Sequence, residues 1–284
     1  KLRHDDPDRD EGRSEEHTSE LQAEDGIRCA LPIFHQTMPG KAFLYGLPYE
    51  FYEKYKIRRY GFHGTSHKYI TIEAAKMLGK DIKELKLISA HLGNGASLAA
   101  VKGGKVVDTS MGLTPLEGLV MGGRSGDVDA TVPLFLLRQG YSIDEVDNIL
   151  NKKSGVYGIS GISNDMRDIE KAIKEGHKRA QLAFDVYTYR IAKYIGSYAT
   201  ILNGFDALVF TAGVGENDPE VRKTVCDYLG IFGVKLDDEK NISLNRIGGI
   251  ISSDDSKVTV MVIKTNEELM IARDTKEIVE NQKK

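Results

Sequence analysis

Three glycine-rich segments of this sequence have the composition of loops that bind phosphate. The clearest is FTAGVGEN at 210–217, which follows an apolar run and precedes a helix start at Asp218. Glycines allow backbone amides to approach an anion closely, and the N-terminus of a helix supplies unpaired N–H groups. The others are HLGNG at 91–95 and MGGRSGD at 121–127, in which the planar guanidinium of Arg124 could bind an anion. Each segment alone also fits an ordinary turn, or a surface arginine in a flexible loop.

A histidine between two glycines is a further candidate for a functional residue. His63 lies in RYGFHGTSH at 59–67, where one glycine precedes it by two residues and another follows it directly. Because glycine permits tight turns, this pattern favours an aimed side chain over a structural histidine. His67 falls one helical turn later and is better interpreted as a helix-face residue.

Near the end of the chain, TNEE at 265–268 predicts a capping box. In that motif Thr265 caps the closing helix and Glu268 returns a hydrogen bond to the cap. Glu267 has no such structural duty and could face a metal ion at the helix start. Together with the glycine-rich loops, this carboxylate indicates phosphoryl transfer that depends on Mg²⁺.

The elements that must position these residues alternate between strands and helices. Apolar residues at helical spacing predict a helix at 65–78, Ser142 and Glu145 form a capping box, and Gly103-Gly104 marks a hairpin. The other expectations are helices at 47–56, 142–151, 165–202 with a break near Gly176, and 219–229, and strands at 85–90, 97–101, 105–109, 207–210 and 258–263. This order indicates an α/β protein whose strands are covered by helices.

Composition excludes several classes of protein. The 284 residues carry 39 basic and 42 acidic side chains, a net charge of −3, with 40% hydrophobic and 29% charged residues. These fractions are typical of globular proteins, and no apolar run approaches the ~18 residues of a membrane span. The chain has no basic cluster, so we expect no nucleic-acid partner and no membrane contact. Only Cys29 and Cys226 are present, which favours a reducing cytoplasm.

Residues 1–33 differ from the rest of the chain. They carry a net charge of −5 and almost no apolar periodicity, which is typical of disorder. The runs RSEEHTSELQ at 13–22, QAEDGIR at 22–28 and CALPI at 29–33 resemble translated pieces of a sequencing-library adapter. We therefore expect an artefactual or disordered segment, with a disordered acidic tail as the alternative, and leave it out of the fold.

From Phe34 to about Glu280 the chain resembles the acetate kinase family. The motifs that carry the resemblance are FHQTMP at 34–39, 59–67, 91–95, 111–127, SNDMR at 163–167, TAGVGEN at 211–217 and 265–275. The resemblance implies the ribonuclease H-like α/β fold of the actin, Hsc70 and sugar-kinase superfamily, with two similar domains around a nucleotide cleft. It also implies reversible transfer of the γ-phosphate of ATP to acetate, which gives acetyl phosphate and ADP and requires Mg²⁺, with Mn²⁺ as a possible substitute.

The same resemblance assigns roles to individual residues. His63 and Arg124 match the residues that stabilise the transition state, Phe62 matches a residue of the acetate pocket, and Glu267 matches the Mg²⁺ ligand. Three segments match the family's ATP contacts: His91, Leu92, Gly93, Asn94 and Gly95; Asp165, Met166 and Arg167; and Gly213, Val214, Gly215, Glu216 and Asn217.

The chain also departs from the family pattern. The family's N-terminal phosphate loop is absent, and Leu31 stands where the family has an active-site aspartate. We therefore expect a largely complete second domain, a first domain that is mostly missing, and impaired activity. In this interpretation residues 34–266 form the nucleotide-binding α/β domain, and 267–284 form a helix that packs on the missing first domain.

Two alternatives stay open at this point. One is a kinase for propionate or butyrate, because the volume of the acid pocket cannot be determined from one sequence. The other is a nucleotide-binding fragment without transferase activity. The expected partners are acetate and ATP, in a cytoplasmic protein that forms a homodimer as intact family members do.

Overall fold

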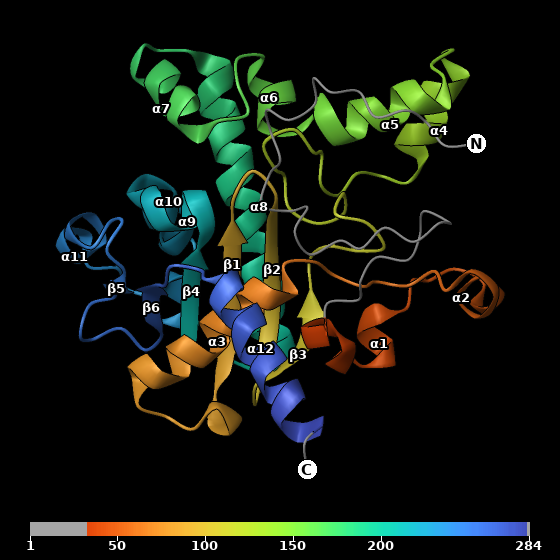
Figure 1. Cartoon of the computed structure of the whole chain (residues 1–284). Helices are drawn as coiled ribbons and strands as arrows, with labels where there is room; N and C mark the ends of the chain where they lie inside the picture. Colours follow the sequence, from red (N-terminus) through yellow and green to blue (C-terminus); the bar gives the residue numbers. More distant parts are fainter. Residues whose placement is uncertain (1–32, 283–284) are drawn as a thin grey trace.

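A computed structural model describes residues 33–282, so the expectations for Cys29 and Leu31 lie outside the described residues. A six-stranded mixed sheet forms the centre (Figure 1), in the order β3-β2-β1-β4-β6-β5. β1, β2 and β3 form an antiparallel meander, β4 runs parallel to β1, β6 runs parallel to β4, and β5 is antiparallel to β6. The strands span Lys86–Leu92 (β1), Ala96–Lys102 (β2), Lys105–Thr109 (β3), Ala207–Thr211 (β4), Gly249–Ile250 (β5) and Thr259–Val262 (β6).

Most of the expected elements are confirmed. Gly103 and Gly104 have φ of +59° and +74° and connect β2 to β3, because glycine adopts positive φ without strain. The capping box of Ser142 and Glu145 is present. The helices span Gly40–Phe43 (α1), Tyr49–Tyr55 (α2), Gly64–Leu78 (α3), Thr131–Arg138 (α4), Ile143–Lys152 (α5), Gly155–Ser160 (α6), Met166–Lys174 (α7), Lys178–Leu202 (α8), Ala212–Asn217 (α9), Pro219–Asp227 (α10), Asp238–Ser243 (α11) and Glu267–Gln282 (α12).

Helices cover both faces of the sheet. Along β1, Ile88 and Ala90 belong to a core shared with α8, whereas Leu87 belongs to a second core shared with α3. This alternation follows from the two-residue period of a strand. Figure 1 shows α8 behind the sheet, and α3 with α12 in front of it. The α/β class is therefore confirmed.

The closing helix lies along α3. Asp274 accepts a hydrogen bond from Lys68 at 2.6 Å, and Arg273 donates to Glu73 at 3.0 Å. Between residues 33 and 282 no helix combines the length and apolar character needed to cross a membrane.

Two local expectations are wrong. Residues 212–217 form the short helix α9 and not a glycine loop. The capping box at Thr265 is not formed, because the side chain of Asn266 caps α12 by accepting the N–H of Leu269 at 3.0 Å. Both polar groups of Thr265 are bonded elsewhere, its N–H to Glu216 and its hydroxyl to Ser66.

Candidate nucleotide site

The three segments that match the family's ATP contacts meet at one cavity of about 780 Å³. It lies where β1 and β4, which are parallel neighbours, reach their carboxyl ends, a usual place for ligands in α/β sheets. Eight of the thirteen residues line it: Gly93, Asn94, Asp165, Met166, Arg167, Gly213, Val214 and Asn217. The other five, His91, Leu92, Gly95, Gly215 and Glu216, are their neighbours in the chain.

A glycine joins the first of these segments to the loop that carries Arg124. The N–H of Gly122 donates to the carbonyl oxygen of Asn94 at 3.2 Å. A Cβ atom at position 122 would lie 2.3 Å from Oδ1 of Asn94, closer than real Cβ contacts allow. Only glycine therefore fits here without displacing the Asn94 amide from the cavity wall.

The second segment places an ion pair at the rim of the cavity. Asp165 caps α7 by accepting the N–H of Arg167 at 2.9 Å, and it also binds the guanidinium of Arg167 at 2.5 Å. The hydrogen bond from Arg167 holds the pKa of Asp165 below its ordinary value. The side chain of Arg167 is 85% exposed, so it faces solvent apart from its bonds to Asp165.

The third segment is held by an internal carboxylate. Oε1 of Glu216 accepts the N–H of Ala212 at 2.8 Å, the hydroxyl of Thr211 at 3.2 Å and the N–H of Thr265 at 3.0 Å. Ala212 has a φ of +65°, a strained value for alanine that these bonds support. Glu216 thus stabilises the start of α9 and the approach to α12.

His63 lies beside this cavity in a cluster of imidazoles. Its backbone is left-handed, with φ of +57°, at the N-cap of α3. Its ring stacks on that of His91 with centroids 4.0 Å apart, and its Nδ1 lies 2.8 Å from Oγ of Ser97. His91 precedes the cavity residue Gly93 by two positions, so the stacked pair lies near that end of the cavity.

Burial keeps the other histidines of the cluster uncharged. The pKa values of His67 and His91 are well below the ordinary range, first because of burial and then because of neighbouring histidines. His35 is buried with its pKa lowered to about 3 by the same causes. The expectation that His67 is a helix-face residue holds for its place in α3, but its side chain is fully buried and hydrogen-bonded.

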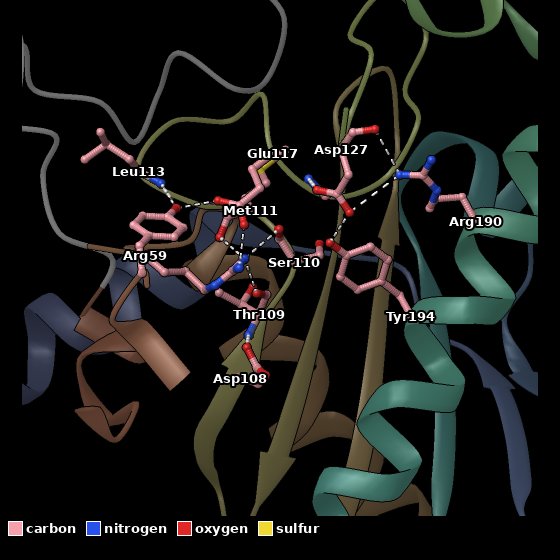
Figure 2. A network of polar contacts seen from close by, with 12 residues as sticks. Arg59, Asp108, Thr109, Ser110, Met111, Leu113, Glu117, Asp127, Arg190 and Tyr194 are labelled. Atoms are coloured by element: carbon pink, nitrogen blue, oxygen red, sulfur yellow. Dashed lines mark hydrogen bonds and ion pairs between the residues drawn. The ribbon is translucent and has the colours of Figure 1, made fainter. Parts of the chain in front are cut away.

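The loop with Arg124 is anchored at two points (Figure 2). Nη1 of Arg59 donates to three successive carbonyl oxygens, those of Thr109, Ser110 and Met111, at 3.0, 2.9 and 3.3 Å. Nη2 of Arg59 forms an ion pair with Glu117 at 2.5 Å, and Glu117 also accepts the hydroxyl of Tyr45.

The second anchor of this loop is Asp127. It accepts the hydroxyl of Tyr194 at 2.7 Å and the N–H of Gly118 at 2.8 Å, and Arg190 lies 3.5 Å from its carboxylate. Arg124 is half-buried between the two anchors, with Nη1 3.9 Å from the sulfur of Met121. The loop conformation is therefore set by side chains from α8 and from the segment before α3.

The remaining candidates lie at the edges of this arrangement. Phe62 is 7% exposed and packs in the core next to His63. Glu267 is the half-buried first residue of α12, two positions after Thr265. The described part of the chain contains no group of three or more His, Cys, Asp or Glu side chains that could hold a metal. A cation here would combine one carboxylate with phosphate and water oxygens, which suits Mg²⁺.

Several cavity residues lie outside the three segments that match the family's ATP contacts. They include Glu170 from α7 and Asp218 from the start of α10, which face one another, and Tyr187 from α8. Burial and then the charge of Asp218 raise the pKa of Glu170 to about 7. The hydroxyl of Tyr187 has no hydrogen-bond partner among the described residues. The other lining residues outside these three segments are Gly122, Val156, Asn164 and Arg246, of which 122 and 164 fall within the longer family motifs at 111–127 and 163–167.

Comparisons with known proteins point to one family. The model of the acetokinase family matches residues 29–273. The acetate kinase of Thermotoga maritima is 64% identical over 250 residues, which cover 87% of this chain and 62% of that protein.

Solved structures give the same result. The crystal structure of Porphyromonas gingivalis acetate kinase superimposes with a TM-score of 0.85 at 49% identity, over 88% of this chain and 63% of that one. A propionate kinase from Francisella tularensis superimposes with a TM-score of 0.80 at 46% identity, over 85% of this chain and 62% of that one. The chain thus spans somewhat under two thirds of the length of these relatives.

Proposed function

The chain belongs to the acetokinase family, and on that premise we propose that it acts in the reversible transfer of the γ-phosphate of ATP to acetate. The products are acetyl phosphate and ADP. The fold is that of the actin, Hsc70 and sugar-kinase superfamily. The observation that supports the proposal best is the meeting of three separate segments at one cavity, beside His63 and the Arg124 loop.

In this proposal the cavity binds the nucleotide with its phosphates toward Gly93 and Asn94. The stacked rings of His63 and His91 lie next to these residues, and so does the loop that carries Arg124. Charge that spreads over the transferring phosphoryl group is stabilised by preorganised donors and cations. His63 and Arg124 are assigned that role. Phe62, directly before His63, would contribute the apolar contact to the methyl group of acetate.

Glu267 is assigned to the divalent cation, Mg²⁺ or in its place Mn²⁺. Its carboxylate is a hard oxygen donor in the first turn of α12, and Thr265 ties that turn to Glu216 and Ser66. The bound cation would neutralise charge on the phosphates.

We assign residues 34–266 to the nucleotide-binding domain and propose that α12 packs on a further part of a longer protein. The helix leaves Leu269, Ile271 and Val279 between 37% and 49% exposed. A homodimer is supported by α4, which has no buried residue and exposes Leu134 and Phe135. We place the reaction in the cytoplasm, where ATP is abundant.

The proposal is tested by trapping acetyl phosphate as its hydroxamate, from acetate and Mg-ATP. The assay uses this chain and a fusion of residues 34–284 to the preceding part of the Thermotoga maritima enzyme. We expect acetate-dependent product from the fusion and much less from the chain alone. Arg124→Ala should lower turnover by at least 100-fold with nucleotide affinity nearly unchanged, whereas Lys105→Ala, at an exposed residue of β3, should change neither.

The alternatives give different results in the same assay. A propionate or butyrate kinase would show a higher kcat/KM with the longer acid. If this chain and the fusion both bind ATP but neither forms ADP when an acid is added, the chain is a nucleotide-binding module without transferase activity. Unchanged turnover of the Arg124→Ala fusion would refute the assigned role of that side chain.

A further inference from the structure

A chain of buried hydroxyls and imidazoles leads from the centre of β1 to His63. Oγ of Ser89 lies 2.6 Å from Nδ1 of His67, and Nε2 of His67 lies 2.8 Å from Oγ of Ser97. Oγ of Ser97 in turn lies 2.8 Å from Nδ1 of His63. Ser89, His67 and Ser97 are at most 1% exposed, so bulk solvent does not reach these partners.

In this series of hydrogen bonds, the position of each hydrogen depends on the positions of the others. His67 is neutral because burial lowers its pKa well below the ordinary range, so only one of its nitrogens carries hydrogen. Ser97 has one hydroxyl hydrogen and lies between two imidazole nitrogens. The chain therefore has two consistent directions: every hydrogen points toward His63, or every hydrogen points toward Ser89.

The hydroxyl hydrogen of Ser89 distinguishes these two directions. If the chain points toward His63, Ser89 donates to His67, His67 donates to Ser97, and Ser97 donates to His63. If it points the other way, Ser89 only accepts, and its own hydrogen has no acceptor among the described residues. A buried donor without a partner is costly, so the first direction is favoured.

We propose that Ser97 and His67 are positioning residues that hold His63 as the Nε2–H tautomer. Nδ1 of His63 then accepts from Ser97, and the outer nitrogen carries the hydrogen. This inference rests on the proposed role of His63 toward the transferring phosphoryl group. A neutral imidazole stabilises phosphoryl oxygens only when it donates, whereas the other tautomer presents a lone pair that repels them.

A parallel chain ends at the ring that stacks on His63. The hydroxyl of Thr265 donates to Oγ of Ser66 at 2.8 Å, and Oγ of Ser66 lies 2.8 Å from Nδ1 of His91. Ser66 accepts from Thr265, and Nδ1 of His91 is the one acceptor for its own hydrogen among the described residues; a buried donor without a partner is costly, so Ser66 donates to His91. His91 is therefore also an Nε2–H tautomer, held by a serine that is not part of the first chain.

The tautomers can be measured directly by long-range ¹H–¹⁵N correlation spectra of the full chain labelled with ¹⁵N-histidine. Single His→Gln substitutions assign the ring signals. We expect His63, His67 and His91 each to show a protonated Nε2 and an unprotonated Nδ1. An Nδ1–H form of His63 in the unsubstituted protein would overturn the inference without any variant.

Two serine variants provide matched controls. In Ser97→Ala the two nitrogen signals of His63 should move toward each other, as both tautomers become populated, while those of His91 stay in place. Ser66→Ala should do the reverse, and Ser97→Thr, which keeps the hydroxyl, should restore the pattern of His63. If Ser97→Ala leaves His63 in one tautomer, or disturbs both rings equally, Ser97 does not position His63.

A kinetic measurement separates this inference from the proposed function. In the fusion protein, Ser97→Ala should lower kcat by about 10-fold with little change in the KM for ATP. The spectra require no turnover, so a protein without kinase activity would refute the proposed function while the tautomers still decide this inference.

Discussion

Arg59 is expected to be the main anchor of the loop that carries Arg124. Its guanidinium binds three carbonyl oxygens of residues 109–111 and the carboxylate of Glu117, and only 17% of its side chain is exposed (Figure 2). The perturbation is Arg59→Ala. It removes this donor from the carbonyl oxygens and, among the described residues, leaves Glu117 with only the hydroxyl of Tyr45.

The magnitude follows from burial. Removing one partner of a buried ion pair costs about 3–5 kcal/mol, and the 29% exposure of Glu117 favours the lower end, about 3 kcal/mol. Arg190, at the second anchor, lies 3.5 Å from Asp127 with side chains 24% and 40% exposed. Such a pair contributes about 0–1 kcal/mol, so Arg190→Ala is the matched control.

The assay is thermal unfolding of both variants, followed by circular dichroism. Since 1 kcal/mol corresponds to roughly 2–4 °C for chains of similar or slightly smaller size, Arg59→Ala should lower Tm by about 6–12 °C and Arg190→Ala by less than about 4 °C. Arg59→Lys should give an intermediate loss, because lysine keeps the charge without the planar fork. Equal shifts for Arg59→Ala and Arg190→Ala would refute the reasoning.

Two further predictions concern the cavity. Gly122→Ala should weaken ATP binding by at least about 10-fold in calorimetry, because its Cβ displaces the amide of Asn94, whereas Gly196→Ala, with nothing within 4 Å, should leave binding unchanged and raise stability by ~1 kcal/mol. Burial and Asp218 raise the pKa of Glu170 from its ordinary 4.5 to about 7, so the folded chain keeps a proton that the unfolded chain loses, and stability should fall as pH rises from about 4.5 to 7. Tm measured from pH 4.5 to 8 should show this fall for the unsubstituted chain and a smaller one for Glu170→Gln; parallel curves would exclude a role for this carboxyl group.

The sequence predicts well those elements whose signals are local. The Gly103-Gly104 turn fixes the hairpin of β2 and β3, and the capping box at Ser142 marks the start of α5. The three segments that match the family's ATP contacts could be recognised because each surrounds a strand end or helix start with a distinctive set of residues. The meeting of the first and third segments at one cavity follows from the parallel pairing of β1 and β4, whereas the second reaches the cavity from the start of α7.

Structural features that depend on residues distant in the sequence could not be predicted. Residues 212–217 contain two glycines and suggest a loop, yet they form α9 because Glu216 supports its first residue. Glu170, Asp218 and Tyr187 come from three helices, and no spacing in the sequence shows that they share a wall of the cavity. Arg222 is fully buried, and its guanidinium donates to the carbonyl oxygen of Gly215 and to the side chain of Asn241. No local pattern in the sequence indicates this burial.

Thr265 shows why a local motif can fail at a functional position. Its N–H binds Glu216, which supports α9 beside the cavity, and its hydroxyl binds Ser66, which leads to His91. In a capping box the N–H of Thr265 would bond to Glu268, but Glu216 accepts it, and the side chain of Asn266 caps α12 one residue later. Glu267 therefore begins the helix directly after a junction fixed to both the nucleotide cavity and the histidine cluster. The connection of this junction to both sites supports the assignment of the Glu267 carboxylate to a cation between the nucleotide cavity and the histidine cluster. The motif at 265–268 alone supports it less.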